Sequence, residues 1–376
     1  MPKKLLLITF FFLAIYFSPS ISQSQQQNSQ TSIEEELLPP PIGLETDTRE
    51  KMRKFIQSIS VFARSYNPNF SIITHGALEL LIKRDIVDEK EYYPARTYMR
   101  TIDGVMTNGM FFGDKVFGEP VSDKIKARKH KLLNIAKSNG LPVFVIDFGT
   151  DKKTIHDSYR LNRKKGYIST TVPAPLAKLG SLPSYPPRPF DEHPRSVISL
   201  KDVSTFAYLT NSAQYGQQAE FVMKMHDNNY DLMITEVLHG RKPLSIRAVE
   251  TLKYKKVGGK RIVFAKINIG LAANHQFYWK SSWREGSPSW IKDPKRNNKD
   301  NYFVEFWNPE WQQIFYGDTN SYIYGLIKLG FNGVLLEGIE DAYRFFEYGE
   351  KEQETTKTPT ITKTSNSVTS SPYPTQ

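Results

Sequence analysis

The sequence predicts an α/β fold, a (β/α)8 barrel of the TIM type. The chain has 376 residues, enough for one large domain of about 250–300 residues with additional tails. Eight short apolar runs alternate with helical patterns, and runs that are apolar throughout are typical of strands buried on both faces. Regular alternation of strand and helix favours a barrel, and an open doubly wound sheet is the alternative.

The predicted elements follow one another without a long gap. Strands are expected at 70–74, 101–106, 143–148, 166–170, 206–209, 232–237, 262–269 and 333–336. The first helix begins at Asp47 or Thr48, carries one apolar stripe and ends at Asn67-Pro68. Further helices are expected at 122–140, 151–164, 245–258 and 308–328, the last with proline at its first position. The barrel therefore covers 47–349, with a proline-rich connection at 171–203.

The amino terminus has the features of a secretory signal at 1–22. Lys3 and Lys4 precede an apolar run over 5–17, and small residues follow it. The run is too short to span a bilayer comfortably, so we expect a secreted or periplasmic protein without stable membrane insertion. An anchor formed by an uncleaved signal is the alternative.

Polar segments flank the expected barrel. Residues 23–46 are rich in Gln and Ser and then in Glu and Pro, and 350–376 are rich in Thr, Ser and Pro. Such compositions bury too little apolar surface to fold, so both are expected to be disordered.

Composition excludes several kinds of site. The chain has no cysteine, which excludes disulfides, thiol nucleophiles and thiolate metal sites. Its net charge of +11 favours anionic partners, but the basic residues are scattered and no nucleic-acid module is recognised. The seven histidines show no metal-binding spacing and no phosphate-binding glycine motif occurs, so we expect neither metal nor cofactor.

All five tryptophans lie within one window, 279–311. Flat rings gathered in a short stretch are typical of surfaces on which sugar rings stack. Trp311 is expected in the core and Trp307 before a helix start. The candidate sugar-binding rings lie in the loop-rich part after a strand: Tyr278, Trp279, Trp283 and Trp290.

Polar residues end most of the predicted strands. Chemistry in a barrel lies at the carboxyl ends of its strands, which here carry His75, Asn108, Asp147, Glu236, Asn268 and Glu337, with Asp341 one helical turn farther on. Asp147, Glu236 and Glu337 are candidate catalytic carboxylates, because glycoside hydrolysis requires a pair of them. The alternative is that these acids are solvated or cap helices. His75, Asn108, Asn268 and Asp341 are candidate substrate contacts.

Several strings resemble one known family. They are Phe277-Tyr278-Trp279, Asn301 to Val304, Phe306 to Gln312, Gly330 to Val334 and Asp341 to Tyr343. Together they resemble the endo-α-1,4-polygalactosaminidase-like family, glycoside hydrolase family 114 and its relatives, over about 200–348. The resemblance implies a secreted barrel that hydrolyses galactosamine-containing polysaccharide.

The resembling strings occur in an unusual order. Those at 67–70, 102–105 and 145–148 resemble motifs that in the family follow the Asp-Ala-Tyr string, yet here they precede it. The resemblance thus implies a circularly permuted barrel. In it, residues 171–203 join the two segments that form the amino and carboxyl ends of the family's barrel. Barrel termini lie close together, so such a rearrangement costs little.

The chain departs from the family pattern at acidic positions. Leu271 and Ala273 replace two glutamates, Gln276 replaces an arginine, Asn108 replaces a glutamate and Glu337 replaces an aspartate. Three hypotheses remain open: an active glycosidase using Glu337 with Glu236 or Asp147, a degenerate barrel that still binds glycan, and a structural or interaction barrel. A cationic galactosamine polymer would be repelled by the positive chain, so N-acetylated or acidic glycan is the better expectation.

Overall fold

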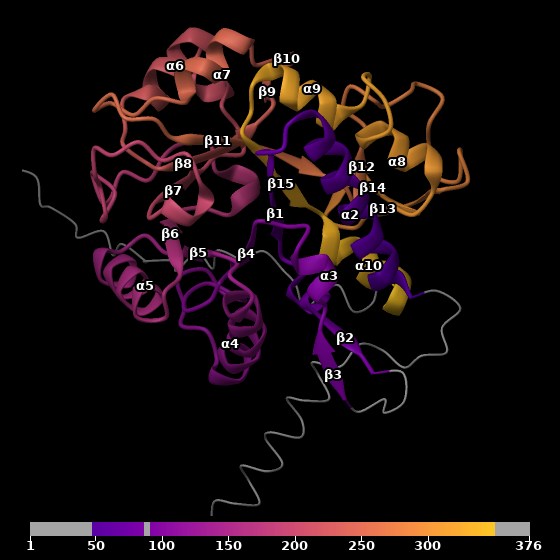
Figure 1. The fold of residues 1–376 in the computed structure, drawn as a ribbon, viewed down its shortest axis with the longest axis horizontal. Coiled ribbons are helices and arrows are strands. Elements are labelled where there is room, and N and C mark those ends of the chain that lie inside the picture. Colours follow the sequence, from indigo (N-terminus) through magenta and orange to yellow (C-terminus); the bar gives the residue numbers. More distant parts are fainter. Residues whose placement is uncertain (1–46, 86–90, 350–376) are drawn as a thin grey trace, which may run out of the picture.

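The fold is a nearly closed parallel barrel, seen in a computed structural model that describes residues 47–85 and 91–349 (Figure 1). The predicted signal, leader and tail lie outside the described residues. No helix in the described part combines the length and hydropathy needed to cross a membrane.

Eight parallel strands form the barrel in the order β6-β5-β4-β1-β15-β11-β8-β7. Each strand lies beside its neighbours along the chain, and the last strand pairs with the first. This cyclic order confirms the predicted eight-stranded parallel barrel, since a doubly wound sheet would reverse its order. The strands are β1 (Ser71–His75), β4 (Gly104–Asn108), β5 (Val143–Phe148), β6 (Ile168–Val172), β7 (Phe206–Tyr208), β8 (Leu232–Glu236), β11 (Ile262–Asn268) and β15 (Gly333–Glu337).

The barrel has a seam between β6 and β7. These two strands lie next to each other, but no backbone ladder joins them among the described residues. The proline-rich connection between them carries the short helices η2 (Leu176–Lys178) and η3 (Leu200–Asp202) in place of the usual α-helix. Proline cannot donate a backbone hydrogen bond, which explains why this connection forms no long helix.

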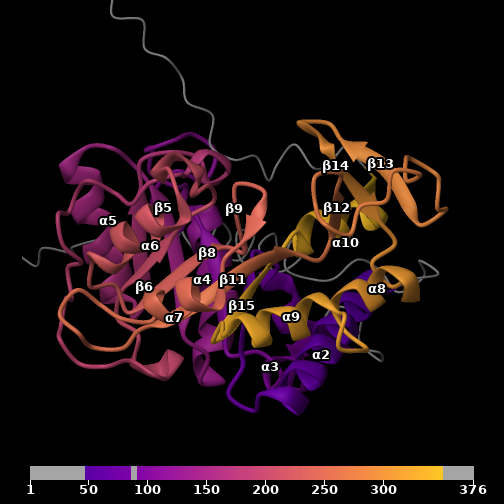
Figure 2. The same cartoon turned by 90° about the horizontal axis from the view of Figure 1, so that it is seen from above.

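Helices pack outside the strands, as Figures 1 and 2 show. The predicted cap Asp47 is present and accepts from the amide of Glu50 at 2.9 Å; Asp151 likewise caps its helix by accepting from the amide of Thr154 at 2.8 Å. The helices are α2 (Thr48–Tyr66), α3 (Arg96–Met99), α4 (Asp123–Ser138), α5 (Lys152–Lys164), α6 (Gln218–His226), α7 (Ile246–Leu252), α8 (Pro309–Phe315), α9 (Tyr322–Leu329) and α10 (Ile339–Tyr348).

Two helix predictions were too long. The segment expected as one helix over 308–328 is two helices, because Gly317 adopts a φ of +128° and the Asp318 side chain closes a turn onto Asn320. The helix after Ser245 ends at Leu252, where the chain bends so that Tyr254 can bridge to Lys260.

A small sheet forms a subdomain beside the barrel, next to α10 (Figure 2). It consists of β12 (Leu271–Ala273), β13 (Ile291–Lys295) and β14 (Asn298–Val304), inserted between β11 and α8. The sequence did not predict it, nor two short hairpins. These are β2 (Ile82–Arg84) with β3 (Tyr92–Pro94), and β9 (Leu238–His239) with β10 (Lys242–Pro243).

Alternate residues of each strand fill the barrel interior, as the two-residue period of a strand requires. The interior side chains are apolar and buried at the middle of the strands; they include Ile73, Met106, Phe144, Ile146, Phe206, Ile234, Phe264 and Leu335. The intervening residues face the surrounding helices and form the outer core. This alternation decides which strand-end side chains point into the mouth of the barrel.

A buried ion pair fixes the proline-rich connection to the barrel. The Lys255 ammonium lies 2.6 Å from Asp231 Oδ1 and donates to the carbonyls of His193 and Arg195 at 3.2 and 2.9 Å. Both side chains of the pair are almost fully buried. Removing Lys255 would leave the buried Asp231 carboxylate without its ammonium partner, with hydrogen bonds from Ser204 and Thr205 as its remaining compensation.

We therefore expect Lys255→Met to lower the free energy of unfolding by about 3–5 kcal/mol. Urea denaturation followed by circular dichroism measures the change. The neighbouring Lys256→Met is a matched control, because Lys256 pairs with Asp227 at the surface and should cost no more than about 1 kcal/mol. Equal losses in both variants would contradict a structural role for the buried pair.

Candidate active site at the barrel mouth

Six polar side chains point into the mouth of the barrel at the carboxyl ends of its strands. Each lies two residues beyond an apolar interior residue, so strand alternation directs it inward. They come from six different strands: His75, Asn108, Tyr208, Glu236, Lys266 and Glu337. The structure thus brings together four of the predicted site residues and adds Tyr208 and Lys266.

Glu337 lies at the centre of this group. Its Oε1 accepts a hydrogen bond from the Tyr208 hydroxyl at 2.6 Å and lies 3.2 Å from His75 Nδ1. Its Oε2 lies 3.4 Å from the Lys266 ammonium. Three side chains therefore fix both the position and the orientation of the carboxylate.

The surroundings of Glu337 keep it ionised. Burial by itself would raise its pKa, but the Lys266 ammonium, His75 and the Tyr208 hydroxyl outweigh burial and hold the pKa well below its usual range. The pKa of Lys266 is raised although burial opposes this, because the Glu337 carboxylate lies beside it and Tyr208 and Glu236 add to the effect. Glu337 and Lys266 are thus a charged pair throughout the physiological pH range.

Glu236 has the opposite electrostatic character. Burial raises its pKa and the charge of Glu337 adds to this, while Lys266 only partly compensates. Its Oε1 lies 3.2 Å from the Lys266 ammonium. Since that ammonium is 3.4 Å from Glu337 Oε2, the two carboxylate oxygens cannot lie more than about 6.6 Å apart. One site therefore holds a protonatable carboxyl and an ionised carboxylate.

His75 and Asn108 complete the inward-facing group. His75 Nε2 lies 2.8 Å from Asn108 Oδ1, and its other ring nitrogen faces Glu337. A carboxylate and an amide oxygen both accept, so the His75 ring is the donor in either contact that is a hydrogen bond. Asn108 thereby orients His75 against Glu337.

Asp147 lies outside this group, contrary to the sequence-based prediction. On β5 the interior positions are Ile146 and Phe148, so alternation turns Asp147 outward toward α5. It is fully buried and accepts from Ser158 at 2.7 Å, from Asn162 at 2.9 Å and from the amides of Met110, Phe111 and Phe112. The carboxylate fastens the loop after β4 to α5 and has no exposed surface for a substrate.

Asn268 and Asp341 also hold the structure together. Asn268 Oδ1 accepts from the amides of Gly270 and Leu271 at 3.0 and 2.9 Å, which turns the chain out of β11. A side chain at Gly338 would come within 2.0 Å of the same oxygen, so only glycine fits directly after Glu337. Asp341 forms an ion pair with Lys295 and thereby joins α10 to the subdomain.

The tryptophan window is a contiguous cluster that includes core residues. Trp290 is only 2% exposed and donates to Glu310 at 3.0 Å, so it has no free face for a sugar, contrary to the prediction. Trp311 is fully buried and donates to the Ile269 carbonyl at 2.9 Å, as a core residue should. Trp279 is half-buried and stacks on Tyr302, and Trp283 contacts both Trp279 and Trp290 edge to face.

Phe277 is an exposed ring at the edge of the aromatic cluster. It is 60% exposed and packs edge to face against Tyr322 and Tyr278. Burial raises the pKa of Tyr322, and Tyr278 and Glu236 add to this shift. Burial raises the pKa of Tyr278 to about 12, and its hydroxyl accepts from the Ala273 amide at 3.2 Å. Phe277 therefore offers an exposed flat surface one ring contact away from Tyr322.

Sequence reasoning missed Lys266, Tyr208 and Phe277 as site residues. Counting every second residue from the apolar interior positions Phe264 and Phe206 would have indicated the first two. Nothing in the sequence distinguishes Phe277 from the tryptophans that follow it, because its exposure depends on the subdomain. Residues 47–85 and 91–349 contain no cluster of three His, Asp or Glu side chains arranged to hold a metal ion.

Comparisons with known proteins give relatives without an assigned activity. No family model matches the chain. It is 26% identical over 207 residues to an uncharacterized protein of Methanocaldococcus jannaschii, a match that covers 52% of this chain and 58% of that protein. It is 38% identical over 88 residues to an uncharacterized protein of Thermotoga maritima, covering 23% of this chain and 25% of that protein.

A third similar protein, from Deinococcus radiodurans, is likewise uncharacterized. The identity is 31% over 84 residues, which covers 22% of this chain and 26% of that protein. The chain thus spans between about a quarter and three fifths of the relatives it matches. The similarity transfers no activity, and the case for a function depends on the site.

The opposite pKa shifts of the two glutamates can be measured by carbon-13 NMR titration of their carboxyl groups. We expect Glu236 to titrate above, and Glu337 well below, the usual pH for glutamate. Lys266→Met should raise the pKa of Glu337, because it removes the nearest positive charge. Because the folded pKa of Glu337 is depressed, its stabilising contribution is present above the unfolded pKa and is lost as pH falls through the folded pKa.

Lys292→Met is the matched control for this titration. Lys292 pairs with Glu305 in the subdomain at 2.6 Å, so its loss removes an equal charge away from the barrel mouth. It should leave the titration of Glu337 unchanged. An unchanged Glu337 in Lys266→Met as well would contradict the assigned role of Lys266.

Proposed function

We propose that this protein is a secreted glycoside hydrolase-like enzyme that cleaves glycan at the barrel mouth. One observation carries the proposal: two carboxyl groups flank the same ammonium, one with a raised and one with a depressed pKa. Pairs of titratable groups whose surroundings separate their pKa values are typical of acid–base catalysis. Glycoside hydrolysis needs such a pair on either side of the scissile bond.

The geometry assigns a role to each group. Glu236, with its raised pKa, would protonate the leaving glycosidic oxygen. Glu337, held ionised by Lys266 and Tyr208, would attack the anomeric carbon or activate water. The upper bound of about 6.6 Å between their oxygens favours retention of configuration, for which carboxyl groups about 5–5.5 Å apart are typical. His75, beside Glu337, would help to fix its orientation.

The substrate class follows from the resemblance and from one exposed ring. The resemblance implies a hexosamine-containing polysaccharide, and the exposed face of Phe277 suits the apolar face of a sugar ring. The net charge of +11 favours an N-acetylated or acidic glycan over a cationic one. Trp279, with one face against Tyr302, would contact sugars farther from the cleavage point.

We also propose that the chain is circularly permuted relative to glycoside hydrolase family 114. Two structural features support this. The barrel lacks a ladder between β6 and β7, where the usual ends of the family would meet. The ends of the described barrel lie together as well, because Thr48 donates to Glu347 at 2.7 Å and Arg49 forms an ion pair with it. A family barrel whose original ends were joined between β6 and β7, and whose chain was opened between α10 and α2, would keep the same arrangement of strands.

A second candidate function is glycan binding without hydrolysis. Leu271 and Ala273 are buried and apolar. They stand where the family pattern has glutamates, so neither position supplies a carboxylate. Asn108 stands in place of a further glutamate and contacts His75 instead. In this case the ion pairs of Lys266 with Glu236 and Glu337 would only hold the two side chains in place for binding.

The hydrolase proposal is tested with isosteric variants and a panel of N-acetylated, partly deacetylated and acidic hexosamine polysaccharides. Release of new reducing ends should fall by roughly 10²–10⁴-fold in Glu236→Gln, which loses the proton donor. The release of reducing ends by Glu337→Gln should fall by at least the same factor. Glu285→Gln, an exposed residue of the subdomain, is the matched control and should keep full activity.

The pH profile discriminates between the two roles. Activity should rise with pH as Glu337 ionises, at a pKa well below the usual glutamate value. It should fall again as Glu236 loses its proton, at a pKa above the usual glutamate value. If the wild type and all variants bind the polysaccharide equally and none releases new reducing ends, glycan binding without hydrolysis is favoured. Neither binding nor release from any polysaccharide would contradict both.

The sugar platform has a separate test. Phe277→Ala should raise KM or weaken oligosaccharide binding by about 3–10-fold with little change in kcat, the size expected for one ring contact. Tyr254→Ala, which removes an exposed ring near the opposite end of β11, should change neither. A loss of kcat alone in Phe277→Ala would contradict a binding role.

A further inference from the structure

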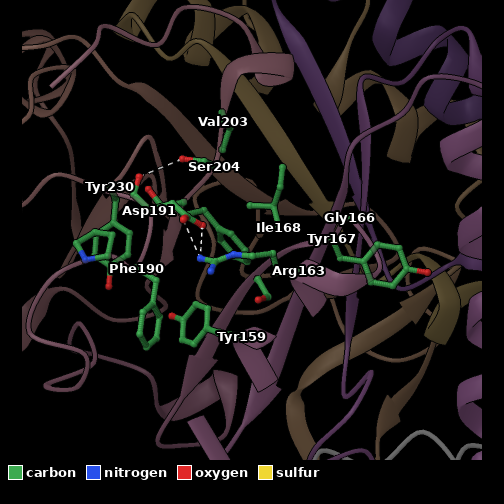
Figure 3. A pocket seen from close by; sticks show the side chains of 14 residues that line it. Tyr159, Arg163, Gly166, Tyr167, Ile168, Phe190, Asp191, Val203, Ser204 and Tyr230 are labelled. Atoms are coloured by element: carbon green, nitrogen blue, oxygen red, sulfur yellow. Dashed lines mark hydrogen bonds and ion pairs between the residues drawn. The ribbon is translucent and has the colours of Figure 1, made fainter. Parts of the chain in front are cut away.

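A cavity opens at the amino ends of β6 and β7, at the opposite end of the barrel from Glu337. It has a volume of about 210 Å³ and lies in the seam, between Ile168 of one strand and Phe206 of the other (Figure 3). Since no ladder joins these strands, their facing edges are separated at this point. The proline-rich connection, through Phe190 and Asp191, forms one wall.

Aromatic side chains line this cavity. Tyr230 is only 5% exposed, although it lines the space. Tyr159 of α5 packs edge to face against Phe190 with ring centroids 4.4 Å apart. Ring walls of this kind suit a flat apolar group, and a volume of about 210 Å³ accommodates one six-membered ring with a substituent.

Positive charge dominates the entrance. Arg163 reaches the cavity from α5 and donates to both carboxylate oxygens of Asp191 at 2.7 Å (Figure 3). An adjoining groove of about 350 Å³ is lined by Arg160, Arg163 and Lys164. Asp157 and Asp191 offset only part of this charge, so an anionic group at the entrance would be attracted.

We propose that the seam cavity is a binding site for a small aromatic anion, a ring carrying a phosphate or carboxylate group. The ring lies between Tyr159, Phe190 and Tyr230, and the anion meets Arg163 at the entrance. Arg163 exchanges part of its pairing with Asp191 for the ligand, since a guanidinium can bind two oxyanions through its fork of donors. This site is independent of the proposed hydrolase activity, because it shares no residue with the barrel mouth.

The test is isothermal titration of the full chain with phenyl phosphate, benzoate, phenol and inorganic phosphate. Phenyl phosphate or benzoate should bind at least about 10-fold more tightly than phenol or inorganic phosphate, because only they carry both ring and charge. Arg163→Leu should weaken binding about 10-fold or more, and Phe190→Ala should weaken it as well. Asp191→Asn should strengthen binding several-fold, because it frees the guanidinium.

Arg64→Leu provides a matched control. Arg64 pairs with Asp103 at 2.8 Å on α2, so this variant removes the same charge from an arginine–aspartate pair outside the seam. It should leave affinity unchanged. The proposal is overturned if no aromatic anion binds at millimolar concentration, if inorganic phosphate binds as tightly as phenyl phosphate, or if Arg64→Leu and Arg163→Leu weaken binding equally. Unfolding temperatures of each variant identify any that fail to fold.

Discussion

The ammonium of Lys266 lies between two carboxylates at the mouth of the barrel, and the chemistry of that end depends on it. Without this cation, Glu236 and Glu337, held within about 6.6 Å of each other, would repel and the pKa of each would rise. With the cation, the more buried and more strongly hydrogen-bonded Glu337 stays ionised, while Glu236 keeps a raised pKa. One buried charge thus divides two chemically equal side chains into a potential acid and a potential nucleophile.

The position of Lys266 follows from the closed sheet. Strand alternation sends every second side chain inward, and the apolar layers below exclude water from the barrel interior. The polar residues at the strand ends therefore form one partly buried layer, in which hydrogen bonds and charges are stronger than at the surface. Gly338 and Asn268 keep the ends of β15 and β11 close enough for this layer to be continuous.

The seam is where the same barrel is least regular. The connection between β6 and β7 cannot form a helix through its prolines, and the Lys255–Asp231 pair holds it against the barrel instead. Because the ladder is missing there, aromatic side chains fill the gap incompletely and leave the cavity beside Arg163. The two ends of the molecule thus differ in character: an acidic, hydrogen-bonded mouth and an aromatic, cationic seam.

Sequence patterns alone determined the elements and their order. Apolar runs located all eight barrel strands within a few residues, and Asp47 marked the start of the first helix. These signals are local, since burial on both faces and capping depend on residues next to one another in the chain. Strand ends likewise pointed to Glu337, Glu236, His75 and Asn108.

Only the tertiary structure decided which of these residues meet. Asp147 ends a strand as Glu236 does, yet it faces outward because its place in the alternation differs by one residue. Trp290 resembles Trp279 in sequence, but the fold of the subdomain buries one ring and leaves the other half-exposed. Side-chain direction and burial are set by contacts between segments far apart in the chain, and a local pattern does not contain that information.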